Sequence, residues 1–227
     1  PHAYLADLPS KLTATGVGRG YRADEAAEET PPPRKEVQLR APLFEQGEKK
    51  LTPAEIGTAH HLFMQFCDFD AACAPNGVEN ELNRLAEKKI LSTEQAHAVD
   101  KRKIERFFAS DLYKTFMAEN KVRREFKFSV LVPAQAYFPV AADAPEENVL
   151  LQGVIDCLIE TRDGFVILDF KTDRIKKGGA VERAEQYRPQ LAAYARAVHE
   201  IYGRPVRACV LYFFHTGDTE WVSLDED

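Results

Sequence analysis

A pair of β-rich runs in the second half of the chain constrains its fold most strongly. The runs Val149–Thr161 and Phe165–Lys171 are separated by Arg162-Asp163-Gly164. An Asp-Gly pair between two apolar runs indicates a β-hairpin. We therefore expect two adjacent strands, around which the rest of the chain is organised.

Three charged side chains lie inside this predicted hairpin. Asp156 falls within the first strand, and Asp169 and Lys171 share one face of the second with Ile167, because alternate strand residues point the same way. A charge among apolar side chains must be paired or must bind a metal. The two carboxylates are hard oxygen ligands that suit Mg²⁺ or Mn²⁺, and Lys171 on the same face could hold an attacking water or neutralise developing charge. The spacing equally fits a salt bridge between Asp169 and Lys171, with Asp156 capping a turn.

Composition bounds the class of protein. The chain has 227 residues, 44% of them hydrophobic, which suits one large domain or one domain with extensions. Its net charge is −6, whereas a freestanding nucleic-acid-binding protein is more often basic. It has no apolar run of membrane-spanning length, no secretory signal and no Cys-x-x-Cys pair typical of a zinc or iron–sulfur site. We expect a cytoplasmic protein with no membrane partner.

The first fifty residues carry little periodic pattern. Thr30-Pro31-Pro32-Pro33 is typical of an extended linker, and the chain does not begin with Met. We expect residues 1–50 to be an extension or linker from a longer chain, and residues 51–227 to form the main domain.

A helix is predicted to follow this extension. Thr52-Pro53-Ala54-Glu55 has the pattern of a capping box with proline in the first turn. The helix carries His60 and His61, of which one is expected to face the core while the other can be a metal ligand. Ser92-Thr93-Glu94-Gln95 is a second capping box, and it predicts another helix that reaches Phe108.

The later part of the chain alternates between predicted strands and one more helix. Pro189 suits the first turn of a helix that runs to Tyr202, with Gly203 as its C-cap. Tyr187, Gln190 and Tyr194 share a face of this helix only if it begins before them. Further strands are expected at Arg124–Val132, Arg207–Phe214 and Trp221-Val222. The order of elements predicts an α/β fold with a central mixed sheet.

Five motifs occur along the chain in a characteristic order. They are Gly57-Thr58-Ala59-His60-His61, Arg124-Glu125-Phe126, Gly153-Val154-Ile155-Asp156, Leu168-Asp169-Phe170-Lys171-Thr172-Asp173 and Tyr187-Arg188-Pro189-Gln190-Leu191-Ala192-Ala193-Tyr194. With these motifs the chain resembles the RecB-type nuclease domains of the PD-(D/E)xK superfamily, most of all the carboxy-terminal nuclease domain of AddA-type subunits of bacterial helicase–nucleases. The resemblance runs from about Leu51 to Val222 and, more weakly, over Pro9–Thr15.

The resemblance implies a role for each matching residue. It implies a restriction-endonuclease-like core, a central mixed sheet flanked by helices, with an N-terminal extension and a helical insert. The implied catalytic residues are Asp156, Asp169, Lys171 and Gln190. The implied metal ligands are His61, Asp156, Asp169 and the carbonyl of Phe170, and the implied supporting residues are Glu125, Tyr187 and Tyr194.

The resemblance also implies an activity and its partners. The expected function is a Mg²⁺- or Mn²⁺-dependent DNA exonuclease domain of an ATP-dependent helicase–nuclease in double-strand break repair by homologous recombination. The substrate would be a single strand from an unwound duplex end. ATP would be used only by helicase domains of the parent chain, since no Walker motif occurs here. A second nuclease or helicase subunit would be a further partner.

Two other interpretations stay open. One is a freestanding exonuclease of the same superfamily, and the other is a non-catalytic domain that keeps the fold for DNA binding or docking. The chain lacks the cysteine set with which AddB-type nuclease domains hold an iron–sulfur cluster, which favours the AddA-type resemblance. Since phosphate neutralisation supplies most non-specific DNA affinity, the net charge of −6 suggests that other parts of an assembly deliver the DNA.

Overall fold

The predicted hairpin forms the centre of the sheet. In the computed structural model, which describes residues 9–17, 51–138 and 147–224, β3 (Asn148–Thr161) and β4 (Gly164–Lys171) pair antiparallel. Thr161 pairs with Gly164 across a two-residue turn. Gly164 has a φ of 147°, and a Cβ there would lie 2.2 Å from the Pro205 carbonyl oxygen. Only glycine therefore fits where the turn meets the next strand.

The sheet is mixed, as the sequence predicts. Its order is β1-β3-β4-β5-β6, with β2 paired to β3. The β1–β3 and β4–β5 pairs are parallel and the other pairs are antiparallel. The remaining strands are β1 (Lys11–Thr13), β2 (Lys121–Pro133), β5 (Val206–Phe213) and β6 (Asp218–Val222).

The two edges of β3 are used differently. β2 pairs along one edge for nearly the whole length of β3. The other edge is shared, because β1 pairs with residues 150–152 and β4 with residues 157–161. Within the described part of the chain, residues 153–156 therefore have no strand partner on that edge. Asp156 lies at the end of this gap.

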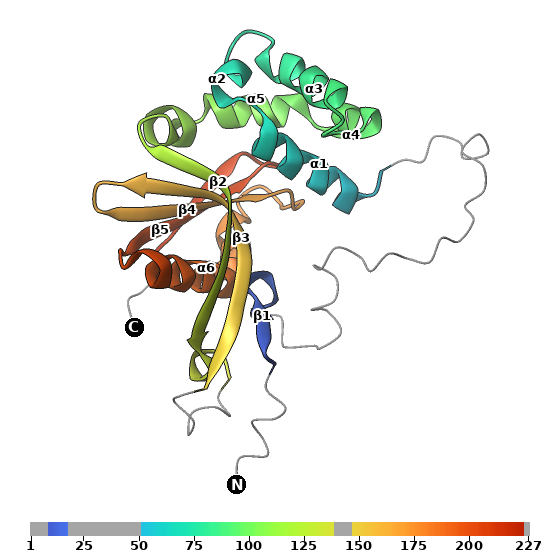
Figure 1. Ribbon diagram of the computed structural model, residues 1–227. Helices are drawn as coiled ribbons and strands as arrows, with labels where there is room; N and C mark the ends of the chain where they lie inside the picture. Colours follow the sequence, from blue (N-terminus) through green and yellow to red (C-terminus); the bar gives the residue numbers. More distant parts are fainter. Residues whose placement is uncertain (1–8, 18–50, 139–146, 225–227) are drawn as a thin grey trace, which may run out of the picture.

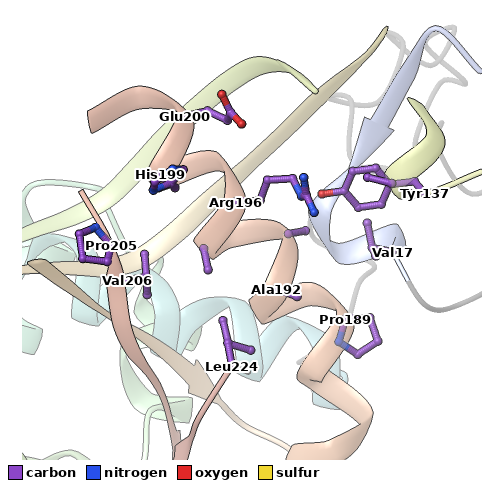
Figure 2. Close-up of a pocket in the computed structure, with 13 residues that line it drawn as sticks. Val17, Tyr137, Pro189, Ala192, Arg196, His199, Glu200, Pro205, Val206 and Leu224 are labelled. Atoms are coloured by element: carbon purple, nitrogen blue, oxygen red, sulfur yellow. The ribbon is translucent and has the colours of Figure 1, made fainter. Parts of the chain in front are cut away.

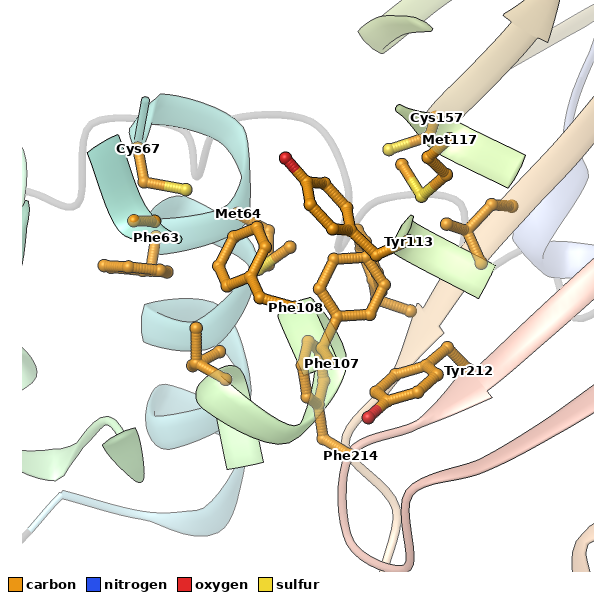
Figure 3. Close-up of a cluster of buried hydrophobic side chains, with 14 of the residues drawn as sticks. Phe63, Met64, Cys67, Phe107, Phe108, Tyr113, Met117, Cys157, Tyr212 and Phe214 are labelled. Carbon is orange, nitrogen blue, oxygen red and sulfur yellow. The ribbon is translucent and has the colours of Figure 1, made fainter. Parts of the chain in front are cut away.

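Helices α1 to α5 gather on one face of the sheet (Figure 1). Phe107 is at the centre of the core beneath them, with its ring 5.2 Å from that of Phe170 and 4.9 Å from that of Tyr212, centroid to centroid (Figure 3). Edge-to-face aromatic packing of this kind adds to the stabilisation from burial. The elements on this face are α1 (Pro53–Phe66), α2 (Phe69–Ala72), α3 (Gly77–Glu87), α4 (Thr93–Ala98), α5 (Lys101–Ala109) and the π-helical turn Leu112–Met117.

The two predicted capping boxes both form. Thr52 and Glu55 cap α1 reciprocally, and Ser92 and Gln95 do the same for α4. The single helix expected from Ser92 to Phe108 is instead two helices, α4 and α5. The chain is extended at the break, where the Asp100 N–H donates to Nε2 of His60 at 3.3 Å. This tertiary hydrogen bond is not visible in the helical periodicity.

Helix α6 (Ala180–Tyr202) covers the opposite face of the sheet (Figure 1). It begins well before the predicted start, so Pro189 lies inside it. Ala180 and Ala184 are buried one turn apart and continue the apolar face toward the N-terminus. Because proline lacks an N–H, this position forgoes one helical hydrogen bond, which the packing of the long helix offsets. Gly203 is the left-handed C-cap, as predicted.

The side chains of β3 change sides at Asp156. The odd-numbered Leu151 and Ile155 pack in the core beneath α6, whereas the odd-numbered Cys157 and Ile159 pack in the core beneath α1 to α5. Strict alternation would put all four on one face. The strand pair β2–β3 therefore crosses from one core to the other at this residue.

Residues 11–16 belong to the sheet and its core. Leu12 of β1 and Ala14, in the 3₁₀ turn Ala14–Gly16, are both buried. The linker predicted at Thr30–Pro33 lies outside the described residues. No described helix is both long and apolar enough to cross a membrane.

Candidate active site

Asp156 connects the two strands where their pairing stops. The β3–β4 ladder ends at Cys157 and Leu168, one residue short of Asp156 and Asp169. Oδ2 of Asp156 instead accepts a hydrogen bond of 2.7 Å from the N–H of Phe170. A side-chain carboxylate thus replaces a ladder bond at the gap in the sheet.

His61 brings helix α1 to the same carboxylate. Its Nδ1 lies 3.3 Å from Oδ1 of Asp156, so Nδ1–H donates and Nε2 is the ring nitrogen not engaged with Asp156. Burial lowers the pKa of His61, but the hydrogen bond and charge of Asp156 outweigh it and raise the pKa overall. A Cβ on Gly57, one turn earlier, would lie 2.8 Å from Oγ1 of Thr172. Glycine thus allows α1 to approach the segment after β4.

His60 has a structural role. It is 3% exposed, its Nδ1–H donates to the Ile56 carbonyl at 2.9 Å, and Nε2 accepts from Asp100. Burial lowers its pKa, which keeps the ring neutral. Of the two histidines that the sequence left undecided, His61 therefore faces the site.

Lys171 is held by three neighbours. Its Nζ lies 2.7 Å from Oδ2 of Asp169, donates to Oε1 of Gln190 at 3.2 Å, and lies 3.8 Å from the centre of the Tyr187 ring. Gln190 is fixed in turn because its Nε2 donates to the hydroxyl of Tyr194 at 2.7 Å. The early start of α6 puts these three helix residues on one face, toward β4.

Glu125 is the strained residue of the site. Its φ of 50° is in the left-handed region, which costs a non-glycine residue about 1 kcal/mol or more. The β2–β3 ladder pairs Arg124 with Cys157 and Phe126 with Ile155, and Glu125 lies between these pairs, opposite Asp156. Burial raises the pKa of Glu125, and the negative charge of Asp156 raises it further.

Arg124 anchors helix α1 beside this strained residue. Its Nη1 donates to the carbonyls of Met64 at 3.1 Å and Cys67 at 2.5 Å. These carbonyls lie at the C-terminal end of α1, where a cation is favoured. The arginine therefore fixes α1, and with it His61, relative to β2.

The electrostatics of the site suit a cation. Burial raises the pKa of Asp169, and the charge of Asp156 adds to that effect although Lys171 opposes it. Oδ2 of Asp169 is buried and, despite its 2.7 Å contact with Lys171, accepts no well-directed hydrogen bond. Carboxylate oxygens of this kind are the ligands that Mg²⁺ and Mn²⁺ prefer.

The donor set fits a divalent metal in chemistry, although its two carboxylates are engaged with different partners. Among the described residues, no three His, Cys, Asp or Glu side chains converge as a metal site does. His61 is turned to Asp156, and Asp169 is turned to Lys171. A bound cation would compete with Lys171 for Asp169.

The sequence did not predict two residues of the site, Asp173 and Arg183. Asp173 accepts hydrogen bonds from the hydroxyl of Tyr187 and from Nε of Arg183, the latter at 2.9 Å. Burial alone would raise the pKa of Asp173, but these donors lower it overall. Burial and the bond to Asp173 raise the pKa of Tyr187 to about 12. The four-residue spacing of Arg183 and Tyr187 on a helix was the available signal, and the predicted start at Pro189 concealed it.

Two cavities flank these elements. One of about 470 Å³ lies next to the site and is lined by Gly57, Lys103, Thr172 and Asp173, among others. The other, of about 720 Å³, lies along α6 near Tyr137, Arg196 and His199 (Figure 2). None of the catalytic candidates lines the second cavity, so it is separate from the site.

Comparison with known proteins shows the family of the chain. The model of the PD-(D/E)XK nuclease superfamily matches residues 34–223. An ATP-dependent helicase/nuclease subunit of Moorella thermoacetica is 40% identical over 220 residues, and that of Desulforamulus reducens is 38% identical over 220 residues. Each match covers 96% of this chain but only 15% and 17% of the respective relative.

The chain therefore spans about a sixth of the length of these relatives. The family match covers most of the chain, and the matches to the two relatives extend over almost all of it. By both measures, the protein belongs to the PD-(D/E)XK nuclease superfamily and is homologous to the AddA-type subunits of ATP-dependent helicase/nucleases.

Proposed function

We propose that this chain is the Mg²⁺-dependent DNA exonuclease domain of a longer ATP-dependent helicase–nuclease. The observation that carries the proposal is the position of Asp156 and Asp169, each one residue beyond the last β3–β4 pair, with Lys171 beside Asp169. Charges there cost free energy unless they are paired or bind a metal. A hydrolase site explains why two carboxylates and a lysine are kept together in an apolar setting.

In the proposed mechanism, Asp156, Asp169, His61 and the carbonyl of Phe170 would hold the cation. A divalent cation bound there would supply Lewis-acid polarisation of the phosphodiester and a bound water of lowered pKa. Lys171 positions the attacking water and offsets the negative charge that develops on the phosphate.

The remaining site residues orient these groups. Gln190 accepts a hydrogen bond from Lys171, and Tyr194 orients Gln190. Glu125 supports the site as a further carboxylate opposite Asp156, and Tyr187 provides an aromatic face for Lys171. Mn²⁺ would serve in place of Mg²⁺, because it accepts the same oxygen ligands.

The proposed substrate is a single DNA strand released from an unwound duplex end. A strand end rather than a base sequence would be recognised, because no element typical of base reading is visible in the sequence. Helicase domains of the parent chain would use the ATP and deliver the strand, and their partner would be a second nuclease or helicase subunit. We place the protein in the cytoplasm, in double-strand break repair by homologous recombination. Residues 51–227 would be the nuclease domain and residues 1–50 an extension, whose strand β1 joins the sheet of that domain.

The test is cleavage of a short end-labelled single-stranded oligonucleotide by the 227-residue chain. A short oligonucleotide presents a free end without a motor. We expect cleavage with Mg²⁺, none with EDTA, and a loss of about a thousandfold in both Asp169→Ala and Lys171→Ala. Asp163→Ala is the matched control, since Asp163 is an exposed carboxylate in the turn of the same hairpin. It should cleave as the wild type does.

Two outcomes would contradict the proposal. A wild-type chain that binds the oligonucleotide but does not cut it would be a non-catalytic DNA-binding domain. Equal cleavage by wild type, Asp169→Ala and Lys171→Ala would place the chemistry elsewhere in the chain.

A further inference from the structure

One face of α6 lies against the charged residues at the end of β4. Arg183, Tyr187, Gln190 and Tyr194 follow one another at intervals of four, three and four residues, which aligns them on a helix. Contacts link this row to alternate residues of the strand and its continuation. Arg183 and Tyr187 contact Asp173, and Tyr187 and Gln190 contact Lys171.

The ring of Tyr187 is the aromatic neighbour of the Lys171 ammonium. Nζ lies 2.7 Å from Oδ2 of Asp169, 3.2 Å from Oε1 of Gln190 and 3.8 Å from the centre of the Tyr187 ring. A cation is attracted to the negative face of an aromatic ring, and more strongly where water is excluded. The Lys171 side chain is only 13% exposed.

Tyr187 is itself held in a closed triangle. Its hydroxyl donates to Oδ2 of Asp173, and Nε of Arg183 donates to the same oxygen at 2.9 Å. Nη2 of Arg183 completes the triangle by donating to the hydroxyl of Tyr187 at 3.1 Å. The side chain of Tyr187 therefore cannot swing about its Cα–Cβ bond, which would move the hydroxyl, without breaking hydrogen bonds to both charged groups.

We propose that Asp173 and Arg183 are positioning residues for Lys171, acting through the ring of Tyr187. This inference rests on the proposed function in one respect, that Lys171 is the catalytic lysine. An ammonium on a flexible four-carbon stem has many rotamers to lose. A fixed ring that closes one side of Nζ limits those rotamers before substrate arrives, which is the preorganisation that catalysis requires.

A purely structural role for Asp173 and Arg183 predicts something different. In that case the pair would only fasten the segment between β4 and α6, and its loss would lower stability without moving Lys171. A measurement that reports on the Lys171 side chain itself distinguishes the positioning role from the purely structural role.

The first measurement is NMR of the 227-residue chain with lysine labelled at the ε-carbon. Protons over an aromatic face are shifted upfield, and the signal of Lys171 is identified by its loss in Lys171→Met. We expect Asp173→Ala and the milder Asp173→Asn to move this signal at least half of the way to that of an exposed lysine. Tyr187→Phe, which keeps the ring but loses its anchor, should move it in the same direction.

Glu185→Ala is the matched control for these variants. Glu185 pairs with Arg188 three residues along the same helix, on its exposed side. Its loss should leave the Lys171 signal in place. An unchanged signal in Asp173→Asn and Tyr187→Phe, with the chain folded, would overturn the proposal.

The second measurement is a double-mutant cycle on oligonucleotide cleavage. We expect Asp173→Ala and Tyr187→Leu each to lower kcat by about tenfold, with KM changed by less than about twofold. If Asp173 acts through Tyr187, adding Asp173→Ala to Tyr187→Leu should have less than about a twofold further effect. Losses that multiply, or that fall on KM alone, would overturn the proposal.

The two measurements separate this inference from the proposed function. A chain in which the Lys171 signal moves as expected, but which cuts no DNA, contradicts the nuclease function and supports the positioning role. A chain that cuts DNA with an unmoved Lys171 signal in the variants supports the nuclease and contradicts the positioning role.

Discussion

Nδ1 of His61 lies 3.3 Å from Oδ1 of Asp156, which joins helix α1 to strand β3 across 95 residues of sequence. The other oxygen of the same carboxylate accepts the N–H of Phe170 from β4. Asp156 thus connects a helix and a neighbouring strand at the place where the sheet is open. A small change at this residue reaches three elements at once.

Mg²⁺ is expected to stabilise the folded chain through Asp156. At a concentration ten times its Kd, a ligand that binds only the native state adds about 1.4 kcal/mol, which raises the Tm of a domain of this size by roughly 3–6 °C. Asp156→Asn removes a charge that would bind the cation and should abolish most of this shift. Thermal unfolding with and without Mg²⁺ measures it. An equal shift in Asp156→Asn and wild type would exclude Asp156 as a ligand, while Asp163→Asn should behave as wild type.

Glu81 is expected to be a principal stabilising residue of the helical layer. Glu81 is 5% exposed, and its carboxylate accepts hydrogen bonds from the N–H of Asp68 and from Arg84 at 2.6–2.7 Å. Glu81→Gln should lower the free energy of unfolding by about 2–3 kcal/mol, since it weakens a largely buried ion pair. Urea unfolding checks this value. Glu79→Gln, which loses only an exposed contact with Lys101, should cost less than about 1 kcal/mol.

The contribution of Glu81 should depend on pH in a defined direction. Hydrogen bonds from Arg84 lower the pKa of Glu81 below its ordinary value of 4.5, against the effect of burial. A carboxyl group with a lowered folded-state pKa stabilises the fold above its unfolded pKa and loses that effect as pH falls through the folded pKa. The difference in stability between wild type and Glu81→Gln should therefore shrink between about pH 5 and pH 3. A difference that grows on acidification would contradict this assignment.

Gly164→Ala should destabilise the hairpin more than a comparable change elsewhere. Gly164 and Gly203 both have positive φ, but only Gly164 has no room for a Cβ, which would meet the Pro205 carbonyl oxygen at 2.2 Å. We expect a loss of about 3 kcal/mol or more for Gly164→Ala, and about 1–2 kcal/mol for Gly203→Ala, where nothing lies within 4 Å. Denaturant unfolding of both variants tests the comparison. Equal losses would show that backbone conformation alone, rather than the close approach, fixes glycine there.

Local patterns in the sequence were sufficient for several elements. The Asp-Gly hairpin, both capping boxes and the C-cap glycine formed as predicted, because each depends on residues within one or two turns of one another. The alternation in β4 correctly predicted that Ile167, Asp169 and Lys171 share a face, which is the face that meets α6. Because these signals depend only on neighbouring residues, they can be predicted from a single sequence without the tertiary structure.

The remaining features depend on distant contacts. Pro189 suggested a helix start, yet buried alanines one and two turns earlier extended α6 to Ala180, and this extension brought Arg183 into reach of Asp173. The break at Asp100 follows from a hydrogen bond to His60, forty residues away. The left-handed conformation of Glu125 leaves no mark on the alternating pattern around it. Tertiary contacts determine the start of α6, the break at Asp100 and the conformation of Glu125, and the periodicity of a sequence carries no information about such contacts.

The crossing of β2 and β3 from one core to the other at Asp156 has a dynamic consequence. Backbone amides on the two sides of the crossing are protected by different hydrophobic clusters, and the ladder to β4 stops between them. Hydrogen exchange should therefore resolve two cooperative units within one continuous ribbon, with the fastest-exchanging amides of β3 at residues 153–156. The proposed catalytic centre would then lie at the boundary between these two cooperative units, where local opening requires the least free energy.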